Sequence, residues 1–283
     1  MGQERLHASP GHRRRVELRA DCERCFALCC VAHAFAASAD FAIDKAAGQP
    51  CPKLGADFRC SIHAGLRQAG FGGCAAYDCF GAGQQVAQVT YGGRDWRRAP
   101  EIAAAMFASF AVLRQLHELL WYLNEALILR PTAPLLGEIG VAFDETERLT
   151  YSRPEALADL DVAAHRQDVN ALLVRASEQV RRQAGQLGTD LRGADLIGTD
   201  LRRADLRRAS LRGARLIGAD LSRADLTMAD CTGADFRGAS VVGADLGSAI
   251  FLTQSQLDSA RGNAATKLPS SLSRPSHWPS GRP

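Results

Sequence analysis

The sequence repeats with a period of five residues from Thr189 to Thr253. Thirteen consecutive units have an apolar residue at the third position, here called the centre: Leu191, Leu196, Leu201, Leu206, Leu211, Leu216, Leu221, Leu226, Cys231, Phe236, Val241, Leu246 and Phe251. Alanine stands two residues before the centre in eleven units, and aspartate stands directly before it in nine. An α-helix, with a period of about 3.6 residues, or a strand, with a period of about 2, would scatter these residues over all its faces. Neither a helix nor a flat strand keeps a five-residue period on one face, so the repeat requires another structure.

The unit resembles the A-(D/N)-L-x-x motif of the pentapeptide-repeat family, and the match runs from Thr189 to Thr253 without a gap. The resemblance implies a right-handed quadrilateral β-helix in which each unit forms one side of the coil. We therefore expect an α+β multidomain chain with this pentapeptide-repeat solenoid at its C-terminal side, preceded by helices and a cysteine-rich module. The alanines and the centres would fill a narrow lumen, where any larger side chain would overlap its neighbours.

A stack of repeats exposes its ends and therefore needs caps. The helices before Ala184 and the segment from Gln254 to Asn263 are the candidates. Cys231 is a centre, so we expect it to be a small buried apolar residue rather than a reactive thiol.

Residues 21–95 contain eight of the nine cysteines. Cysteines that lie close in sequence and are joined by others far away have the spacing of metal sites, because thiolates hold zinc or an iron–sulfur cluster. The candidate metal ligands are Cys22, Cys25, Cys29, Cys30, Cys51, Cys60, Cys74 and Cys79. His33 and His63 are further candidates, and we favour a non-ligand role for both.

The order of the cysteine motifs resembles a family of zinc- or iron-chelating domains. Its members carry clustered cysteines ending in CC, then C-P-x-L, then C-S-I-(Y/H), then two more cysteines, which corresponds here to Asp21 to Phe80. A related pattern occurs in flagellin lysine methylases. The resemblance implies a structural zinc or iron–sulfur site and leaves a redox or methyl-transfer role open.

An amphipathic helix is predicted from Glu101 to Leu129, before Pro131, because apolar residues recur every seven positions: Met106, Leu113, Leu120 and Leu127. A second helix is expected to begin at a capping box made by Ser152 and Glu155. We interpret the pair as a helical hairpin that buries its own seam. The alternative is a homodimer through residues 101–129.

The 283 residues exceed the usual size of a single core and divide into five stretches. We expect a flexible basic arm (1–20), the cysteine-rich metal-binding module (21–95), a helical region (96–184), the repeat (185–253) and a C-terminal cap and tail (254–283). No apolar run is long enough for a signal peptide or a membrane span, so we predict a cytoplasmic protein with reduced cysteines and no membrane partner.

Residues 185–253 contain nine aspartates and nine arginines. Some pentapeptide-repeat proteins mimic DNA and protect gyrase from quinolones, which requires an acidic surface. The balanced charge argues against such mimicry, and we expect arginines beside stacked aspartates, such as Asp205, Asp225 and Asp245, to relieve their repulsion. No catalytic spacing stands out in the sequence. The sequence thus favours a non-enzymatic cytoplasmic binding or regulatory protein with a protein partner. The alternative is a zinc- or iron–sulfur-dependent redox or transfer enzyme.

Overall fold

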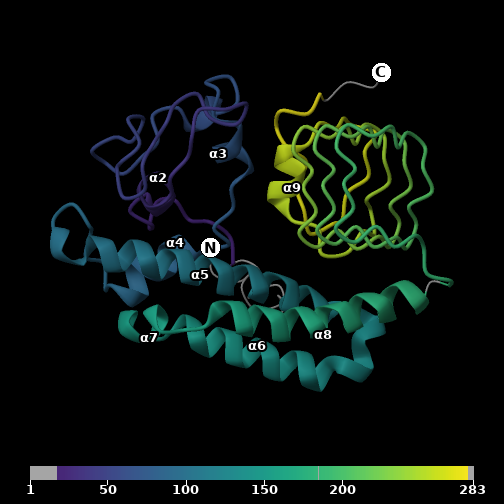
Figure 1. The fold of residues 1–283 in the computed structure, drawn as a ribbon, viewed down its shortest axis with the longest axis horizontal. Coiled ribbons are helices and arrows are strands. Elements are labelled where there is room, and N and C mark those ends of the chain that lie inside the picture. Colours follow the sequence, from purple (N-terminus) through teal and green to yellow (C-terminus); the bar gives the residue numbers. More distant parts are fainter. Residues whose placement is uncertain (1–17, 184, 280–283) are drawn as a thin grey trace, which may run out of the picture. The chain divides into compact units, whose positions relative to one another are not determined.

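The computed structural model describes residues 18–183 and 185–279 (Figure 1). The basic arm expected for residues 1–20 lies outside the described residues, except for its last three. The chain forms two compact units, one made of residues 18–71 and 78–174 and the other of residues 72–77 and 175–279. Each unit has its own core.

The first unit is built around one long helix, α5 (Pro100–Ile128), against which α2, α4, α6 and α7 pack. Its other helical elements are α2 (Leu28–Ala32), η2 (His63–Gly65), α4 (Ala82–Gln84), η3 (Gln85–Thr90), η4 (Arg130–Leu135), α6 (Leu136–Thr150), α7 (Pro154–Ala158) and the first part of α8 (Val162–Gln183). The predicted helix from Glu101 to Leu129 is confirmed to within one residue at each end. It ends where Leu129 adopts an extended backbone, shortly before Pro131.

Most apolar residues of the α5 seam are buried within the chain, and Leu127 is half-buried. Met106, Leu113, Leu116 and Leu123 are fully buried, and Leu120 retains 4% of its surface. The seam is therefore occupied by the chain's own helices, and we do not propose a homodimer through residues 101–129.

The expected capping box at Ser152 and Glu155 is wrong. The short helix α7 has Arg153 as its N-cap, with no side-chain capping bond, and it stops at Ala158. Helix α8 then begins separately, and the Asp161 carboxylate accepts the Ala164 N–H at 2.9 Å. Aspartate is among the strongest N-cap residues, so Asp161 restarts the helix where a continuous one was expected.

The second unit contains the repeat coil, defined as residues 189–253, together with α3 (Gly72–Ala76), the end of α8 and α9 (Gln254–Ser259). Its backbone pairs with itself at a distance of twenty residues, as in the parallel bridges Asp205↔Asp225 and Asp225↔Asp245. Twenty residues are four repeat units, so each turn of the coil lies directly on the next. The coil is the set of stacked loops in green and yellow in Figure 1.

One repeat unit, residues 219–223, shows how the coil is held together. The Asp220 N–H bonds back to the Thr199 carbonyl, while the Leu221 and Arg223 N–H groups bond forward to Ser240 and Val242. The Ala224 N–H closes a turn onto the Leu221 carbonyl at 3.0 Å. The backbone therefore pairs with both neighbouring coils and bends within every unit.

The expected β-helix, and with it the α+β fold class, is wrong. The part of the chain described by the structure contains no β-strand and no sheet, and its regular secondary structure is helical. Only isolated bridges occur in the repeat, one residue per unit. The physical reason is the turn in every unit, which bends the backbone before a second consecutive residue can extend and pair as a strand.

The lumen contains the residues that the repeat predicts. Ala209, Ala219 and Ala239 are fully buried, as are the centres Leu211 and Leu221. Cys231 is also fully buried, as expected for a centre. The first centres, Leu191, Leu196 and Leu201, are only partly buried.

Each bend has a left-handed residue two positions after the centre. Eleven such residues have φ between 57° and 67°, and seven of them are glycines: Gly193, Gly198, Gly213, Gly218, Gly233, Gly238 and Gly243. A type II turn requires a positive φ at this position, and only glycine adopts it without strain. Arg203, Arg208, Arg223 and Met228 occupy the other four bends despite the strain.

The segment predicted as the C-terminal cap, Gln254 to Asn263, begins with α9. Thr253 and Gln256 form a capping box at the start of α9, and the Gln256 amide donates to the carbonyls of Cys231 and Ala234 at 2.8 Å. Beyond α9 the stack continues, because Arg261 bridges to Ser240 and Lys267 to Asp245. The cap thus satisfies carbonyl groups at the end of the lumen.

We predict that Ala219→Leu destabilises the repeat coil by about 1–3 kcal/mol, because the lumen has no room for the added atoms. Leu221→Asp should destabilise it further, since it buries an unpaired charge. Urea unfolding followed by circular dichroism measures both changes. The control is Arg223→Gly at an exposed bend, which we expect to retain stability because φ there is 61°. Equal losses from lumen and control variants would contradict the assigned register.

Candidate functional site

The nine aspartates of the repeat coil complete its backbone hydrogen bonding. Each carboxylate accepts the N–H of the residue two positions later, as Asp220 does from Ser222 at 2.9 Å and Asp225 from Thr227 at 2.9 Å. The same bond is made by Asp190, Asp195, Asp200, Asp205, Asp230, Asp235 and Asp245. Aspartate commonly forms such local turns with its own backbone. These carboxylates therefore have a structural role.

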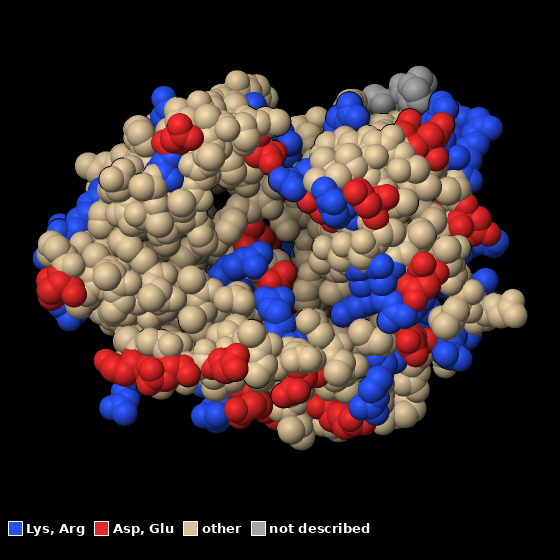
Figure 2. Space-filling model, in the orientation of Figure 1, with Lys and Arg blue, Asp and Glu red and all other residues tan. Residues whose placement is uncertain are grey.

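Arginines on the outer surface neutralise the same carboxylates. Arg202 and Arg207 form two-pronged bonds with Asp200 and Asp205, each with its shortest contact at 2.6 Å. The Arg202 and Arg207 guanidinium groups hold the pKa of Asp200 and Asp205 down at about 2. The predicted relief of repulsion between stacked aspartates is confirmed, because Arg207 also lies 3.9 Å from Asp225 on the next coil. Positive and negative side chains are accordingly interspersed in Figure 2.

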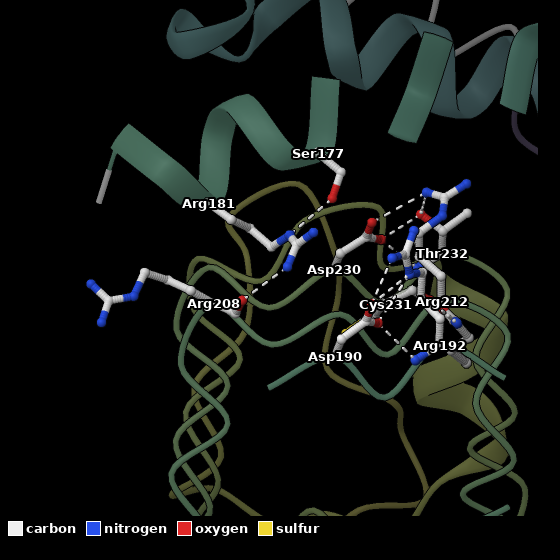
Figure 3. A network of polar contacts seen from close by, with 10 residues as sticks. Ser177, Arg181, Asp190, Arg192, Arg208, Arg212, Asp230, Cys231 and Thr232 are labelled. Atoms are coloured by element: carbon white, nitrogen blue, oxygen red, sulfur yellow. Dashed lines mark hydrogen bonds and ion pairs between the residues drawn. The ribbon is translucent and has the colours of Figure 1, made fainter. Parts of the chain in front are cut away.

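A buried polar network joins the end of α8 to the repeat coil (Figure 3). Arg181 retains 5% of its surface, and its guanidinium donates to the Ser177 hydroxyl and the Arg208 carbonyl, both at 3.1 Å. Burial lowers the pKa of Arg181, and the nearby Asp230 charge opposes that effect. A cation near the C-terminal end of a helix also suits the helix dipole. The network therefore anchors the end of α8, residues 175–183, on the coil of the same unit.

Asp230 is the most deeply buried carboxylate of this network, with none of its surface exposed. It accepts hydrogen bonds from the Thr232 backbone and hydroxyl groups and from the Arg212 guanidinium, the last at 3.2 Å. Arg212 also donates to the Thr232 hydroxyl at 2.8 Å. The charge pair is thus enclosed and its geometry fixed by three further bonds.

One bend of the repeat coil borders a hollow of about 450 Å³, lined by Asp200, Arg202, Arg203, Ser222 and Arg223. Arg203 and Arg223 are twenty residues apart, so they occupy equivalent positions on neighbouring coils, and both are exposed. The Ser222 hydroxyl is bonded to that of Ser240 at 2.9 Å. The hollow presents guanidinium groups to solvent.

The cysteine-rich segment brings predicted ligands together in two pairs. A hydrogen bond between the side chains of Cys22 and Cys25 lowers the pKa of Cys22 to about 6 and raises that of Cys25. The sulfur atoms of Cys29 and Cys30 lie 3.9 Å apart, and their interaction raises the pKa of Cys29 and lowers that of Cys30. In each pair, one thiol therefore ionises more readily than its partner.

Backbone N–H groups point at three of the sulfur atoms. Cys25 is contacted by the Ala27 N–H, Cys60 by that of Ile62, and Cys79 by those of Gly81 and Gly83. Burial is the largest effect on Cys60 and Cys79 and raises the pKa of both, while these N–H groups oppose it. A Cβ atom on Gly83 would meet the Cys25 side chain at 2.8 Å, so glycine allows the close approach of this backbone. N–H groups directed at sulfur stabilise thiolates.

The remaining candidates are more scattered. Cys51 and Cys60 are half-buried, and Cys74 lies on α3 in the second unit. The His63 charge acts on Cys22, whereas the His33 ring packs 5.6 Å from Phe110. Within residues 18–183 and 185–279, no group of three or more histidine, cysteine, aspartate or glutamate side chains is arranged so that it could hold a metal ion.

Two buried polar residues of the first unit were not singled out from the sequence. The Lys45 amine donates hydrogen bonds at 2.8–3.1 Å to three carbonyls, those of Val31, Ala46 and Gln49. These bonds hold the loop that follows α2 in place. His117 on α5 bonds through Nδ1 to the Phe80 carbonyl at 2.8 Å, and burial lowers its pKa to about 4. Neither role has a local sequence signal, because both depend on tertiary contacts.

Within the described ranges, no single helix is both long and apolar enough to cross a membrane. The bent pair Pro100–Ile128 and Arg130–Thr150 meets that test by length and composition when taken together, with an angle of 108° between the helices.

The stacked five-residue units, with their alanine-filled lumen and aspartate turns, define a pentapeptide-repeat protein. The family "Pentapeptide repeats" matches residues 189–227 and 214–251, with eight copies of its unit. The uncharacterized protein YybG of Bacillus subtilis (strain 168) is 56% identical over 265 residues, which are 93% of this chain and 95% of that protein. The chain belongs to the pentapeptide-repeat family. The resemblance of Asp21 to Phe80 to zinc- or iron-chelating domains stays a prediction.

Two solved structures of pentapeptide-repeat proteins from Nostoc PCC 7120 are similar to part of the chain. The protein alr5209 is 36% identical, with 34% of this chain and 85% of that chain covered and a TM-score of 0.26. HetL, which is involved in heterocyst differentiation regulation, is 25% identical, with 29% of this chain and 56% of that chain covered and a TM-score of 0.17.

We predict that Asp230→Ala destabilises the repeat coil by about 3–5 kcal/mol, because it leaves the Arg212 guanidinium, whose side chain retains only 12% of its surface, without its partner. The matched control is Asp200→Ala at the same position of another unit, where the pair with Arg202 is exposed and should contribute less than about 1 kcal/mol. Both losses can be measured by urea unfolding of the full chain. Similar losses for the two variants would contradict the role assigned to the buried network.

Proposed function

We propose that the chain is a non-enzymatic binding protein whose repeat coil presents its outer surface to a protein partner. The observation that carries this proposal is the pairing of charges on that surface. The aspartates accept hydrogen bonds from the backbone turns, and most of them also form ion pairs with arginines of the same coil. Groups held in this way support a fixed surface and are not free to transfer protons.

The same pairing distinguishes a protein partner from DNA-like behaviour. A DNA mimic must present unpaired negative charge to a site that binds phosphates. Here Arg192, Arg202, Arg207 and Arg237 lie 2.6–2.7 Å from the aspartates that would supply such charge. A surface of alternating charge with exposed apolar groups such as Ile197 suits a protein interface, where polar and apolar contacts are mixed.

The test is site-specific photo-cross-linking in cells with a photoreactive residue at Ile197, Ser222 or Thr227 on the outside of the coil. We expect one defined protein adduct from at least one of these positions, because only a bound partner stays within reach of the probe. The control position is Val141 on α6, which is 72% exposed in the first unit.

Two results would contradict the proposal. Either no adduct forms at any coil position, or the same adducts form at Val141. Protection of gyrase from quinolones in a supercoiling assay would instead identify a DNA mimic, and it would show that shape outweighs charge.

We also propose that residues 21–80 are a metal-stabilised module and that the protein is cytoplasmic. The donor chemistry supports zinc or an iron–sulfur cluster, because both bind thiolates and N–H groups directed at sulfur stabilise thiolates. The candidate ligands remain Cys22, Cys25, Cys29, Cys30, Cys51, Cys60 and Cys79 in the first unit and Cys74 in the second. A bound metal would supply folding free energy to a segment with few regular elements.

All eight cysteines of the segment are free thiols, which suits a reducing compartment such as the cytoplasm.

We predict that zinc or iron co-purifies with the full chain under anaerobic conditions and that a chelator at neutral pH unfolds the cysteine-rich segment first. The repeat coil should survive, because its alanine and leucine core needs no metal. Metal analysis combined with limited proteolysis measures both effects, and Cys231→Ala is the control variant outside the segment. Free reaction of all eight thiols in native protein without any metal would contradict the module. Turnover of a thiol or methyl donor by the metal-loaded protein would favour a redox or transfer enzyme.

A further inference from the structure

Arg203 and Arg223 occupy backbone positions that their side chains do not favour. Their φ angles are 57° and 61°, in the left-handed region where seven of the eleven equivalent bends have glycine. An L-residue with a Cβ atom strains the backbone there. Strained residues cluster at functional sites, where the side chain serves something other than folding.

The charges of these two arginines are also unpaired within the coil. Most outer arginines form an ion pair with an aspartate, but among the described residues no carboxylate lies within ion-pair distance of Arg203 or Arg223. Both line the 450 Å³ hollow described above, where Asp200 is already held by Arg202 at 2.6 Å. Strain, unpaired charge and a hollow therefore coincide at one bend.

We propose that this hollow binds a carboxylate of an acidic segment on the protein partner, with the Arg203 and Arg223 guanidinium groups contacting it from neighbouring coils. This inference rests on the proposed function and names the chemistry of the partner. A guanidinium group matches the two oxygens of a carboxylate and binds it in a planar, two-pronged geometry. Two such groups stacked on adjacent coils can hold one carboxylate or two carboxylates from successive turns of a peptide.

The surroundings favour an acidic peptide over a nucleic acid. Asp200 and Asp220 each lie three residues before one of the arginines, and Asp205 and Asp225 follow on the next side of the coil. A continuous phosphate backbone carries a charge at every nucleotide and would approach these carboxylates. A peptide can place its acidic side chains only where the arginines are.

The test is calorimetric titration of the full chain, at low ionic strength, with a peptide in which single glutamates are separated by uncharged residues. We expect the variant Arg203→Gly with Arg223→Gly to bind the peptide at least tenfold more weakly while remaining folded, because glycine suits both bends. The charge-matched control is Arg207→Gln with Arg237→Gln, which removes two arginines that already have aspartate partners. The control should bind within about twofold of the unchanged protein. Met228→Gly relieves the same kind of strain at another bend without a change of charge, and it should bind like the unchanged protein.

Three outcomes would overturn the inference. The first is unchanged peptide binding by the double glycine variant. The second is an equal loss of binding in the charge-matched control, which would show attraction by net charge alone. A single-stranded oligonucleotide or inorganic phosphate that binds more tightly than the peptide, and is lost in the same variant, would assign the hollow to phosphate. Cross-linking separates this inference from the proposed function. If the double glycine variant still captures the partner, the proposed function holds but this site is not needed for it. If no coil position captures a partner, the proposed function itself is contradicted.

Discussion

In a typical repeat unit, four of the five backbone N–H groups bond to backbone carbonyls, and the fifth bonds to an aspartate side chain. In residues 219–223, the four are those of Ala219, Asp220, Leu221 and Arg223, and the fifth is that of Ser222, which bonds to Asp220. An unpaired buried N–H group lowers the stability of the fold. The way the five N–H groups are paired therefore determines which residues each position of the unit accepts. The aspartate, the bend and the twenty-residue spacing are therefore parts of one constraint.

The outer surface follows from the same constraint. An aspartate in most units would stack negative charge along the coil. Arginines two residues later, such as Arg202 and Arg207, neutralise this charge by forming ion pairs with the aspartates. Where the pair is buried, as for Arg212 and Asp230, it is further bonded to Thr232 and joins the network that anchors the end of α8. Arg203 and Arg223 stand outside this scheme, and for that reason we assign them to binding.

Much of the repeat coil could be predicted from the sequence because its period is local and unbroken. The lumen positions Ala219 and Leu221 and the cap that begins at Gln254 follow from counting in fives. The β-helix was wrong because the count does not show that every unit bends after a single bridge. The glycines two residues after the centres were the missed signal, since they mark the positive φ of seven turns.

The first unit was less predictable, because its contacts join residues far apart in the sequence. The long helix α5 was found from its heptads, while α6 was missed even though Ile139, Phe143, Thr146 and Thr150 form one buried face at helical spacing. The second helix was placed at Ser152 rather than after Asp161, since two capping signals lie close together and only tertiary packing selects between them. Cysteine spacing indicated which thiols approach each other but could not reveal the N–H groups that face Cys25, Cys60 and Cys79.

Residue-resolved amide hydrogen exchange on the full chain tests the backbone constraint most directly. We expect slow, similar exchange for amides bonded between coils, such as those of Leu221 and Asp225. We expect faster exchange for amides bonded only to an exposed aspartate side chain, such as that of Arg207. Protection that follows a helical period, or the absence of any difference between these two classes of amide, would contradict the backbone constraint.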